Sequence, residues 1–291
     1  NYFDYDYPAP EEGSVSPLRV SPELAPAPWN PNHLLLRIGL QAKKIDLAQA
    51  PTSNIVFLID VSGSMDEENK LPLLKSSFKM LLGQLRPDDK IAIVTYANGT
   101  KVALPSTSVK DKEKIIKVLD NLYASGGTSG GRGIQLAYEQ AQKSFIKNGN
   151  NRIILATDGD FNIGINNTTD LEKFIEKQRE SGIYMSVLGF GIGNYRDDMA
   201  ETIADKGNGN YAYIDNITEA KKVLVNELSG TLFAVAKDVK LQLEFNPKYV
   251  KEYKLIGYEN RMLANEDFTN DKKDAGEIGA GHTVTALYEL V

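Results

Sequence analysis

The sequence contains no cysteine and only two histidines, His33 and His282. The absence of cysteine excludes disulfides, thiolate catalysis and zinc sites with cysteine ligands. Two histidines so far apart in the sequence argue against a Ser-His-Asp triad or a histidine-rich zinc site, and we interpret them as surface or packing residues. Because proteins without cysteine occur in every compartment, this absence leaves the location open.

The chain also lacks an excess of positive charge and any long apolar run. Its formal net charge is −6, which argues against a general nucleic-acid binder, because such proteins need a basic surface. No apolar stretch approaches the roughly 18 residues of a membrane-spanning helix, so we predict no transmembrane segment. The 291 residues, of which 42% are hydrophobic and 25% charged, are typical of a folded protein with one large domain or two small ones.

The two ends of the chain differ from its centre. Residues 1–32 are rich in proline and acids, which favours extended or polyproline II backbone, and residues 33–46 then have strand-like character. The sequence begins with Asn1 rather than Met, shows no signal peptide, and stops at Val291 in a strand-like segment. We therefore interpret it as a processed or excised piece, in which a missing signal says little about location.

From Asn54 onward, short apolar runs alternate with segments of helical periodicity. The predicted strands are NIVFLID, KIAIVTY, NRIILAT and IYMSVLGFG, and helices are predicted between them. Asn98-Gly99 predicts a hairpin. Strands that alternate with helices indicate an α/β fold, a doubly wound and mostly parallel Rossmann-like sheet, to which the hairpin adds one antiparallel edge strand.

After about residue 236 the apolar residues recur with period two, which indicates strands. We predict that residues 52–230 form the α/β domain and that this domain is inserted into a β-rich domain built from residues 1–51 and 231–291. Chain ends are often neighbours in space, so such insertions are tolerated. The alternative is that the two flanking segments are independent appendages.

Side chains with oxygen atoms lie at the ends of two predicted strands and within one glycine-rich loop. Asp60, Ser62 and Ser64 come at and after the first strand, Thr128 lies in SGGTSGG, and Asp158 follows the strand RIILAT. In open sheets of this type, ligands bind at the carboxyl ends of the strands. Two carboxylates and three hydroxyls suit a small hard cation such as Mg²⁺, which prefers oxygen ligands. Taken singly, the serines could instead cap helices and Asp158 could form a turn.

The order of these segments resembles a known family. D-x-S-x-S at residues 60–64, a threonine in a glycine-rich loop at 128 and T-D-G at 157–159 are similar to the metal-ion-dependent adhesion site of von Willebrand factor type A domains. The resemblance covers about residues 52–230. The outer segments look like those that flank the A domain in a group of bacterial envelope-associated proteins.

This resemblance implies a role for each residue of the site. Ser62, Ser64 and Thr128 would bind the cation through their hydroxyls, and Asp60 and Asp158 would bind it directly or through water. The ion would be Mg²⁺ or Mn²⁺, since the larger Ca²⁺ fits such a site less well. A position open to solvent would be completed by an Asp or Glu carboxylate of a partner protein. The chain would then be a binding or adhesion module and no enzyme, located outside the cell or in the cell envelope, with a lipoprotein or periplasmic protein among the options.

Two other functions stay open at this point. The same cation could serve a metal-dependent hydrolase of phosphate or ester substrates, although no histidine, cysteine or phosphate-binding lysine accompanies the motif. An A domain of an intracellular chelatase or ATPase complex is a third interpretation, which the flanking β-rich segments disfavour.

Several residues are weaker candidates for the same rim. A loop at 189–193 resembles a loose phosphate-binding G-x-G pattern but fails the fuller dinucleotide pattern, and it would place Asn194 and Tyr195 near the ligand. The remaining candidates are Asp66, Glu67 and Glu68 for extra cation affinity, Asp160 and Phe161 for partner contact, and Arg132 as a rim charge. The last helix, near residues 217–229, is the candidate for movement between open and closed states.

Overall fold

The structure is a computed structural model that describes residues 5–46, 48, 50–128, 130–159, 168–191, 197–227, 230, 232–236, 239–257, 263–269 and 276–291. The chain divides into two compact units. We call Asp46–Leu232 the α/β unit, and Asn1–Ile45 with Phe233–Val291 the β unit. The predicted domain boundaries are 51/52 and 230/231, whereas the two units of the structure meet at 45/46 and 232/233.

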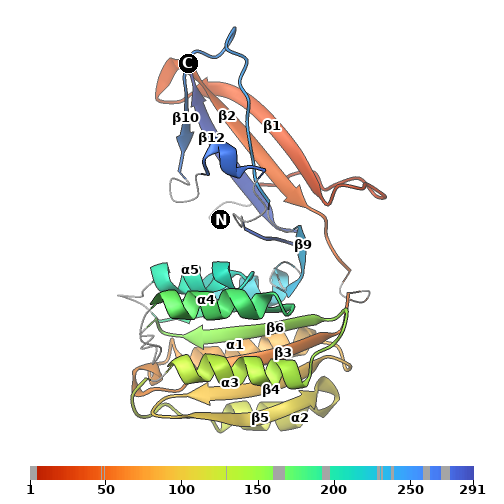
Figure 1. Cartoon of the computed structure of the whole chain (residues 1–291), viewed down its shortest axis with the longest axis vertical. Coiled ribbons are helices and arrows are strands. Elements are labelled where there is room, and N and C mark those ends of the chain that lie inside the picture. The colour runs from red at the N-terminus through yellow and green to blue at the C-terminus, as the bar shows by residue number, and fades with distance from the viewer. Residues whose placement is uncertain are drawn as a thin grey trace. The chain divides into compact units, whose positions relative to one another are not determined.

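A six-stranded sheet forms the centre of the α/β unit (Figure 1). Its strands are β3 (Ser53–Asp60), β4 (Lys90–Tyr96), β5 (Thr100–Ser108), β6 (Asn150–Thr157), β7 (Ile183–Phe190) and β8 (Tyr211–Ile214). They lie in the order β5-β4-β3-β6-β7-β8, in which only the β4–β5 pair is antiparallel. The predicted doubly wound, mostly parallel sheet with one antiparallel edge strand is therefore confirmed.

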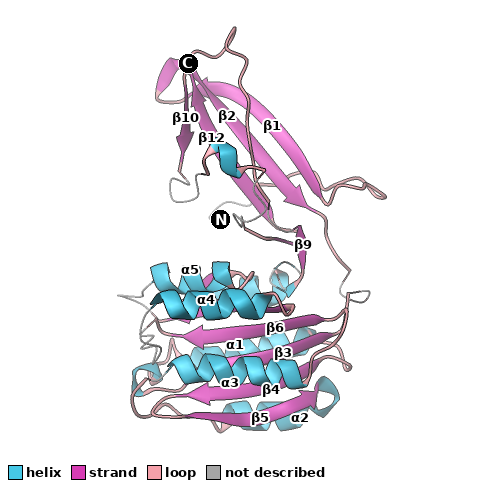
Figure 2. Cartoon of the chain, viewed as in Figure 1, coloured by secondary structure: helices cyan, strands magenta, loops and turns pink. Residues whose placement is uncertain are grey.

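Helices cover both faces of this sheet (Figure 2). They are α1 (Leu71–Gln84), α2 (Lys112–Asp120), α3 (Gly130–Lys143), α4 (Thr168–Arg179), α5 (Asp197–Lys206) and α6 (Ile217–Lys221). One face packs against α3, α4 and α5 through a buried apolar cluster that includes Leu58, Ile134 and Leu155. On the other face Phe57 of β3 stacks on Phe78 of α1 with ring centroids 4.0 Å apart. The predicted closing helix is shorter than expected, because a π-helical turn, η3 (Lys222–Asn226), follows α6.

The central strands carry the candidate site to one edge of the sheet. All eight residues of β3 and all eight of β6 are buried, as expected of parallel strands covered on both faces. The two strands pair in parallel with Ile59 opposite Ala156. Asp60 and Asp158 therefore emerge at the same edge, at the carboxyl ends of neighbouring strands.

The β unit joins the two ends of the chain in one antiparallel sheet. Its four strands are β1 (Leu18–Ala27), β2 (Asn30–Ala42), β12 (Thr283–Leu290) and β10 (Tyr253–Ile256), in that order. β12 pairs with β2 along its whole length, from Thr283 opposite Gln41 to Leu290 opposite Leu34. Two short strands, β9 (Ala234–Ala236) and β11 (Ile278–Gly279), form a second sheet.

Two segments of the β unit differ from the sequence-based expectation. β1 is a strand although it contains Pro22 and Pro26, which a central strand would not tolerate. It is an edge strand, so a missing amide donor can face away from the ladder. Conversely, residues 239–252 do not form the predicted strand, although Phe245 still packs against Tyr253 and Tyr288.

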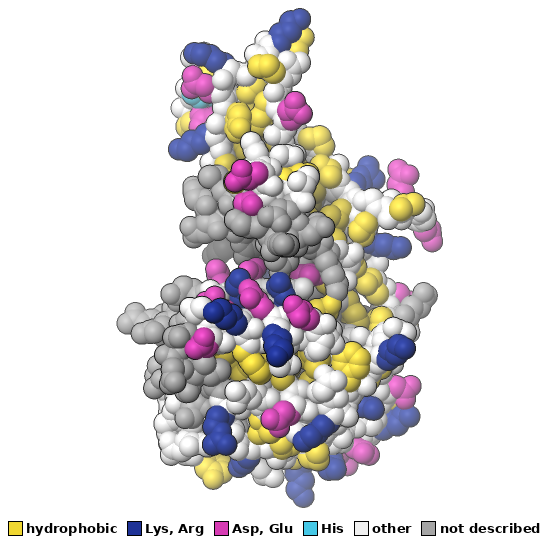
Figure 3. Space-filling view, in the orientation of Figure 1, with side chains coloured by type: hydrophobic (Ala, Val, Ile, Leu, Met, Phe, Trp, Pro, Cys, Tyr) yellow, Lys and Arg dark blue, Asp and Glu magenta, His cyan; other side chains and the backbone are white. Residues whose placement is uncertain are grey.

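The distribution of charge on the surface and the lengths of the described helices bear on whether nucleic acid or a membrane could be a partner. On the face shown in Figure 3, acidic and basic side chains are interspersed over α3, α4 and α5 rather than gathered by sign. Such a mixture does not suggest a binding site for a polyanion. Within the part of the chain that the structure describes, no helix is long and apolar enough to cross a membrane.

Candidate metal centre

Asp60 ends β3 as a fully buried carboxylate. Its Oδ1 accepts a hydrogen bond of 2.8 Å from the backbone amide of Ser62, and the hydroxyl of Thr157 lies 3.5 Å from its Oδ2. Burial raises the pKa of Asp60 to about 6; the hydrogen bonds of Ser62 oppose this increase and the nearby charge of Asp158 adds to it. A bound cation would compensate this carboxylate, which its present partners do only in part.

Ser62 and Ser64 place two hydroxyls immediately after that carboxylate. The backbone turns through a 3₁₀ segment, η1 (Gly63–Met65), for which Ser62 occupies the N-cap position. Among the described residues, no backbone amide is capped by the Ser62 side chain; instead its Oγ lies 3.1 Å from Oγ of Ser64. The interpretation of Ser62 as a capping residue is therefore wrong, because its hydroxyl lies beside that of Ser64 and interacts with the Asp60 carboxylate.

The loop that carries Thr128 is held beside this turn by backbone hydrogen bonds. The amide of Gly63 donates to the carbonyl of Gly126 at 2.9 Å, and the amide of Ser125 donates to that of Val61 at 2.8 Å. Gly126 has a φ of +77°, which glycine adopts readily. Thr128 itself is half-buried and precedes α3, so the structure brings its loop, through the backbone, to the loop of Ser62 and Ser64.

The hairpin asparagine also fixes the Thr128 loop, a role that the sequence analysis did not assign. Asn98 accepts a hydrogen bond of 2.6 Å from the amide of Gly127 through its Oδ1. A side chain at Gly126 would overlap the Asn98 amide. The Asn98-Gly99 pair by itself indicates only a turn, because this contact joins residues 29 positions apart.

Asp158 follows β6, and only 4% of its side chain is exposed. A lysine from another part of the chain, Lys70, lies against it. Nζ of Lys70 lies 3.3 Å from Oδ2 of Asp158. The same ammonium donates to the backbone carbonyl of Ser64 at 2.8 Å and to Oε1 of Glu67 at 2.9 Å. Burial lowers the pKa of Lys70, but Glu67 and Asp158 outweigh it, so the pKa is raised and the side chain stays charged.

This arrangement fits a small divalent cation. The Ser62 amide is hydrogen-bonded to Asp60, and the Ser62 hydroxyl lies 3.1 Å from that of Ser64. Asp158 follows the neighbouring strand at the same sheet edge, and the Thr128 loop is hydrogen-bonded to the serine turn. Every candidate ligand atom is an oxygen, and Asp158 adds its negative charge to the buried Asp60 carboxylate, which Mg²⁺ or Mn²⁺ would compensate. Within the described residues no cluster of three or more His, Cys, Asp or Glu side chains could hold a metal ion, so such a centre would depend on its hydroxyls.

The weaker candidates fall into two groups. Asp160, Phe161, Asn194 and Tyr195 lie outside the described residues. Asp66, Glu68 and Arg132 are exposed, and Glu67 pairs with Lys70. Of the glycine-rich loop after β7, the structure describes Gly191, whose φ is +119°. Gly191 packs against the aliphatic part of Lys70, and an added Cβ would lie 3.1 Å from Cε of that lysine.

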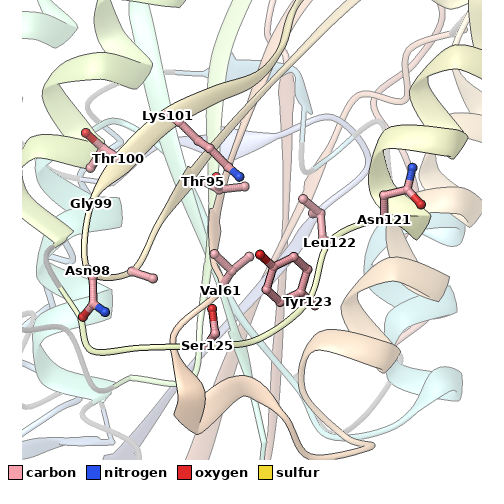
Figure 4. A pocket seen from close by; sticks show the side chains of 11 residues that line it. Val61, Thr95, Asn98, Gly99, Thr100, Lys101, Asn121, Leu122, Tyr123 and Ser125 are labelled. Atoms are coloured by element: carbon pink, nitrogen blue, oxygen red, sulfur yellow. The ribbon is translucent and has the colours of Figure 1, made fainter.

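A pocket of about 330 Å³ is lined in part by residues of the two loops that carry the serines and Thr128 (Figure 4). Its lining includes Val61, which stands between Asp60 and Ser62, and Ser125 of the Thr128 loop. The side chains of Lys101 and Tyr123 point into it. Tyr123 is 72% exposed.

The chain matches three family profiles. The profile described as the von Willebrand factor type A domain matches residues 54–226. One described as the C-terminal part of the uncharacterized protein YfbK matches residues 230–291, and one described as von Willebrand factor matches residues 1–37. The three matches together cover both units.

Curated proteins are similar to this chain over part or all of its length. The uncharacterized protein YfbK of Escherichia coli (strain K12) is 51% identical over 295 residues, which cover 100% of this chain and 51% of that protein. The uncharacterized protein sll0103 of Synechocystis is 30% identical over 64% of this chain and 43% of that protein. The chain thus spans about half the length of these relatives, or less.

Solved structures share the fold. The conserved hypothetical protein BatB from Bacteroides thetaiotaomicron is 22% identical and has a TM-score of 0.51, over 61% of this chain and 97% of that one. A von Willebrand factor type A protein from Catenulispora acidiphila is 20% identical with a TM-score of 0.55, over 89% of this chain and 60% of that one. At these identities the similarity concerns the fold alone.

Proposed function

Because the chain belongs to the von Willebrand factor type A domain family, we propose that it is a divalent-cation-dependent protein-binding module. The cation, Mg²⁺ or Mn²⁺, would be held at the carboxyl edge of the sheet by Asp60, Ser62, Ser64, Thr128 and Asp158. Domains of this family typically bind protein ligands, and an Asp or Glu carboxylate of the partner would complete the coordination of the ion.

The buried carboxylate of Asp60 carries this proposal. A side chain with no exposed surface and a pKa raised by burial is costly to keep ionised without a counter-charge. Two hydroxyls 3.1 Å apart stand next to it, and both are neutral ligands. The hydroxyls add no negative charge to that of the two carboxylates, so the ion can still accept an anionic ligand from outside.

We propose binding rather than catalysis. The α/β unit, residues 46–232, contains no histidine and no cysteine in its sequence, so histidine, the commonest general base, and a cysteine nucleophile are both missing from the unit that carries the site. Metal-dependent turnover of a generic phosphate or ester substrate that Asp60→Ala abolishes would overturn this part of the proposal. The location outside the cytoplasm stays a prediction, which fractionation of cells that express the full-length protein would check.

Thermal unfolding after EDTA treatment tests the cation site. An ion that binds only the folded state stabilises it by roughly 2.7 kcal/mol at about 100 times its Kd. We expect a saturable rise in Tm with Mg²⁺ or Mn²⁺, a smaller one with Ca²⁺, and none in Asp60→Ala. If no ion raises the Tm of the wild-type protein, the proposed function is wrong. A positive result would justify a search for partners with the metal-loaded protein, in which EDTA should release whatever binds.

A further inference from the structure

Lys70 is built into the candidate metal centre. It lies just before α1, and its ammonium reaches the end of β6, where Nζ is 3.3 Å from Oδ2 of Asp158. The carbonyl of Ser64 and the carboxylate of Glu67 accept two further hydrogen bonds, of 2.8 and 2.9 Å. These partners belong to the two segments that carry the proposed ligands, so the ammonium ties the serine turn to the aspartate.

Packing keeps the Lys70 side chain in this place. Only 14% of it is exposed, which is low for a lysine near a surface loop. Its stem lies against Gly191 at the end of β7, where a Cβ would stand 3.1 Å from Cε. The side chain thus contacts residues at the ends of β6 and β7 as well as the turn after β3, and a solvated lysine would make none of these contacts.

The charges around the site give this ammonium a consequence for binding. Asp60, Asp158 and Glu67 bring three negative charges when ionised, and a divalent ion neutralises two of them. Lys70 neutralises the third, so the loaded centre has no net charge. Without Lys70 the loaded centre would be anionic and would repel the carboxylate of a partner.

We propose that Lys70 is a built-in counter-cation of the metal centre, which makes the loaded site accept an external carboxylate and weakens its hold on the ion. This inference rests on the proposed function and adds to it a residue that sets the balance between the two ligands. Lys70 repels the incoming cation and occupies an oxygen of Asp158 that would otherwise turn toward it. The same positive charge attracts the anion that completes the site. Lys70 is therefore a positioning and specificity residue rather than a ligand.

Mn²⁺ binding to four proteins tests this role. We would titrate EDTA-treated wild type, Lys70→Met, Lys70→Gln and Lys79→Met with Mn²⁺ and measure free Mn²⁺ by electron paramagnetic resonance. Lys79 is the matched control, because it lies on α1 and pairs with Asp120 at 2.5 Å, away from the metal centre. Both neutral Lys70 variants should bind Mn²⁺ about tenfold more tightly, the size of the Coulomb repulsion between a dication and an ammonium a few ångström apart under water-like screening. Lys79→Met should match the wild type.

The affinity of the Mn²⁺-loaded site for an external carboxylate is measured with acetate. Acetate that displaces water from bound Mn²⁺ lowers the water-proton relaxation rate, so its affinity follows from a titration of the Mn²⁺-loaded proteins. We expect the Lys70 variants to require several-fold more acetate than the wild type. Circular dichroism in EDTA checks that each variant is folded, and Lys70→Gln, which keeps a neutral hydrogen-bond donor, replaces Lys70→Met if the latter is not folded.

The outcomes separate the two proposals. If the wild type binds Mn²⁺ and the folded Lys70 variants bind it equally or more weakly, Lys70 is not a counter-cation and the proposed function stands. If the variants bind both Mn²⁺ and acetate more tightly, Lys70 weakens ion binding as proposed, but it does not help the site to accept a carboxylate. If the wild type binds no Mn²⁺, the proposed function fails, and the role of Lys70 with it.

Discussion

The amide of Gly63 donates a 2.9 Å hydrogen bond to the carbonyl of Gly126, which joins the turn of Ser62 and Ser64 to the loop of Thr128. In this arrangement Gly126 has a φ of +77°. The Asn98 amide occupies the position that a Cβ at residue 126 would take. The relative position of three proposed ligands thus depends on a backbone contact between two glycines.

Gly126→Ala should therefore damage the ion site more than the fold. Forcing a non-glycine residue into this conformation costs about 1–3 kcal/mol, and the added methyl group must displace Asn98. We expect a modest fall in the free energy of unfolding and a loss of at least tenfold in Mn²⁺ affinity, measured by urea denaturation and by ion titration. Gly99→Ala is the control, since its Cβ would have no neighbour within 4 Å. Equal ion affinity in the two variants would contradict this role of Gly126.

Asp60→Asn should stabilise the metal-free protein while abolishing its response to ions. The pKa of Asp60 is about 6 in the folded protein, against an ordinary value of 3.8. The folded state thus binds more protons than the unfolded one between about pH 4 and 6, and stability falls as the pH rises through that range. Above pH 6 the ionised carboxylate costs on the order of 3 kcal/mol, which the amide avoids. In EDTA, Tm at pH 7 should rise in Asp60→Asn, and the fall in Tm from pH 4 to 6 should weaken.

Asp89→Asn is the matched control, because Asp89 is also buried but its carboxylate is well compensated. The backbone amides of Ser53 and Arg86 each donate to it at 2.7 Å, and the Arg86 guanidinium lies 3.2 Å away. Its amide variant should lose about 1–3 kcal/mol of stability and keep the full response to Mg²⁺. A rise in stability for both variants would show that burial alone, and not the missing cation, decides the result at Asp60.

Ser64→Ala should weaken ion binding without weakening the metal-free fold. The Ser64 hydroxyl is exposed, and its contact given by the structure is the neighbouring Ser62 hydroxyl. Its removal should change the free energy of unfolding in EDTA by less than about 0.5 kcal/mol and lower Mn²⁺ affinity by about tenfold. Ser76→Ala, which removes an exposed hydroxyl from α1, serves as the control for ion titrations. A metal-free Ser64→Ala protein that unfolds much earlier than the wild type would indicate a structural hydroxyl instead.

The sequence predicted the sheet because each of its central strands is an apolar run bounded by polar residues. NIVFLID and NRIILAT both became fully buried parallel strands, and Asn98-Gly99 formed the expected hairpin. The site residues followed from the same pattern, since parallel strands bring their carboxyl ends to one edge. β1 could not be predicted, because Pro22 and Pro26 exclude a strand unless it lies at an edge, and the edge position depends on pairing with β2.

Lys70 could not have been found from the sequence either. It follows the acidic run Asp66–Glu68 and reads as a solvated charge at the start of a helix. Its contact with Asp158 spans 88 positions and arises only because β3 and β6 are neighbours in the sheet. Asn98 was missed for the same reason, since its role at Gly127 depends on where the hairpin lies relative to a loop further along the chain.

Gly39→Ala should unfold the β unit more easily and leave ion binding intact. Gly39 lies in β2 under the ring of Tyr7, and an added Cβ would overlap the ring carbons. Tyr7 is buried and its hydroxyl lies 2.8 Å from that of Thr285 in β12, so the displaced ring would lose both packing and a hydrogen bond. We expect a loss of about 1–3 kcal/mol, measured by urea denaturation followed by tyrosine fluorescence.

Gly276→Ala is the control for Gly39→Ala, because its Cβ would meet no atom within 4 Å. Both variants should bind Mn²⁺ with wild-type affinity, since every proposed ligand lies in the α/β unit and the two substitutions lie in the β unit. A fall in Mn²⁺ affinity in Gly39→Ala alone would mean that the β unit supports the metal centre, and the two units could then no longer be treated as independent in binding.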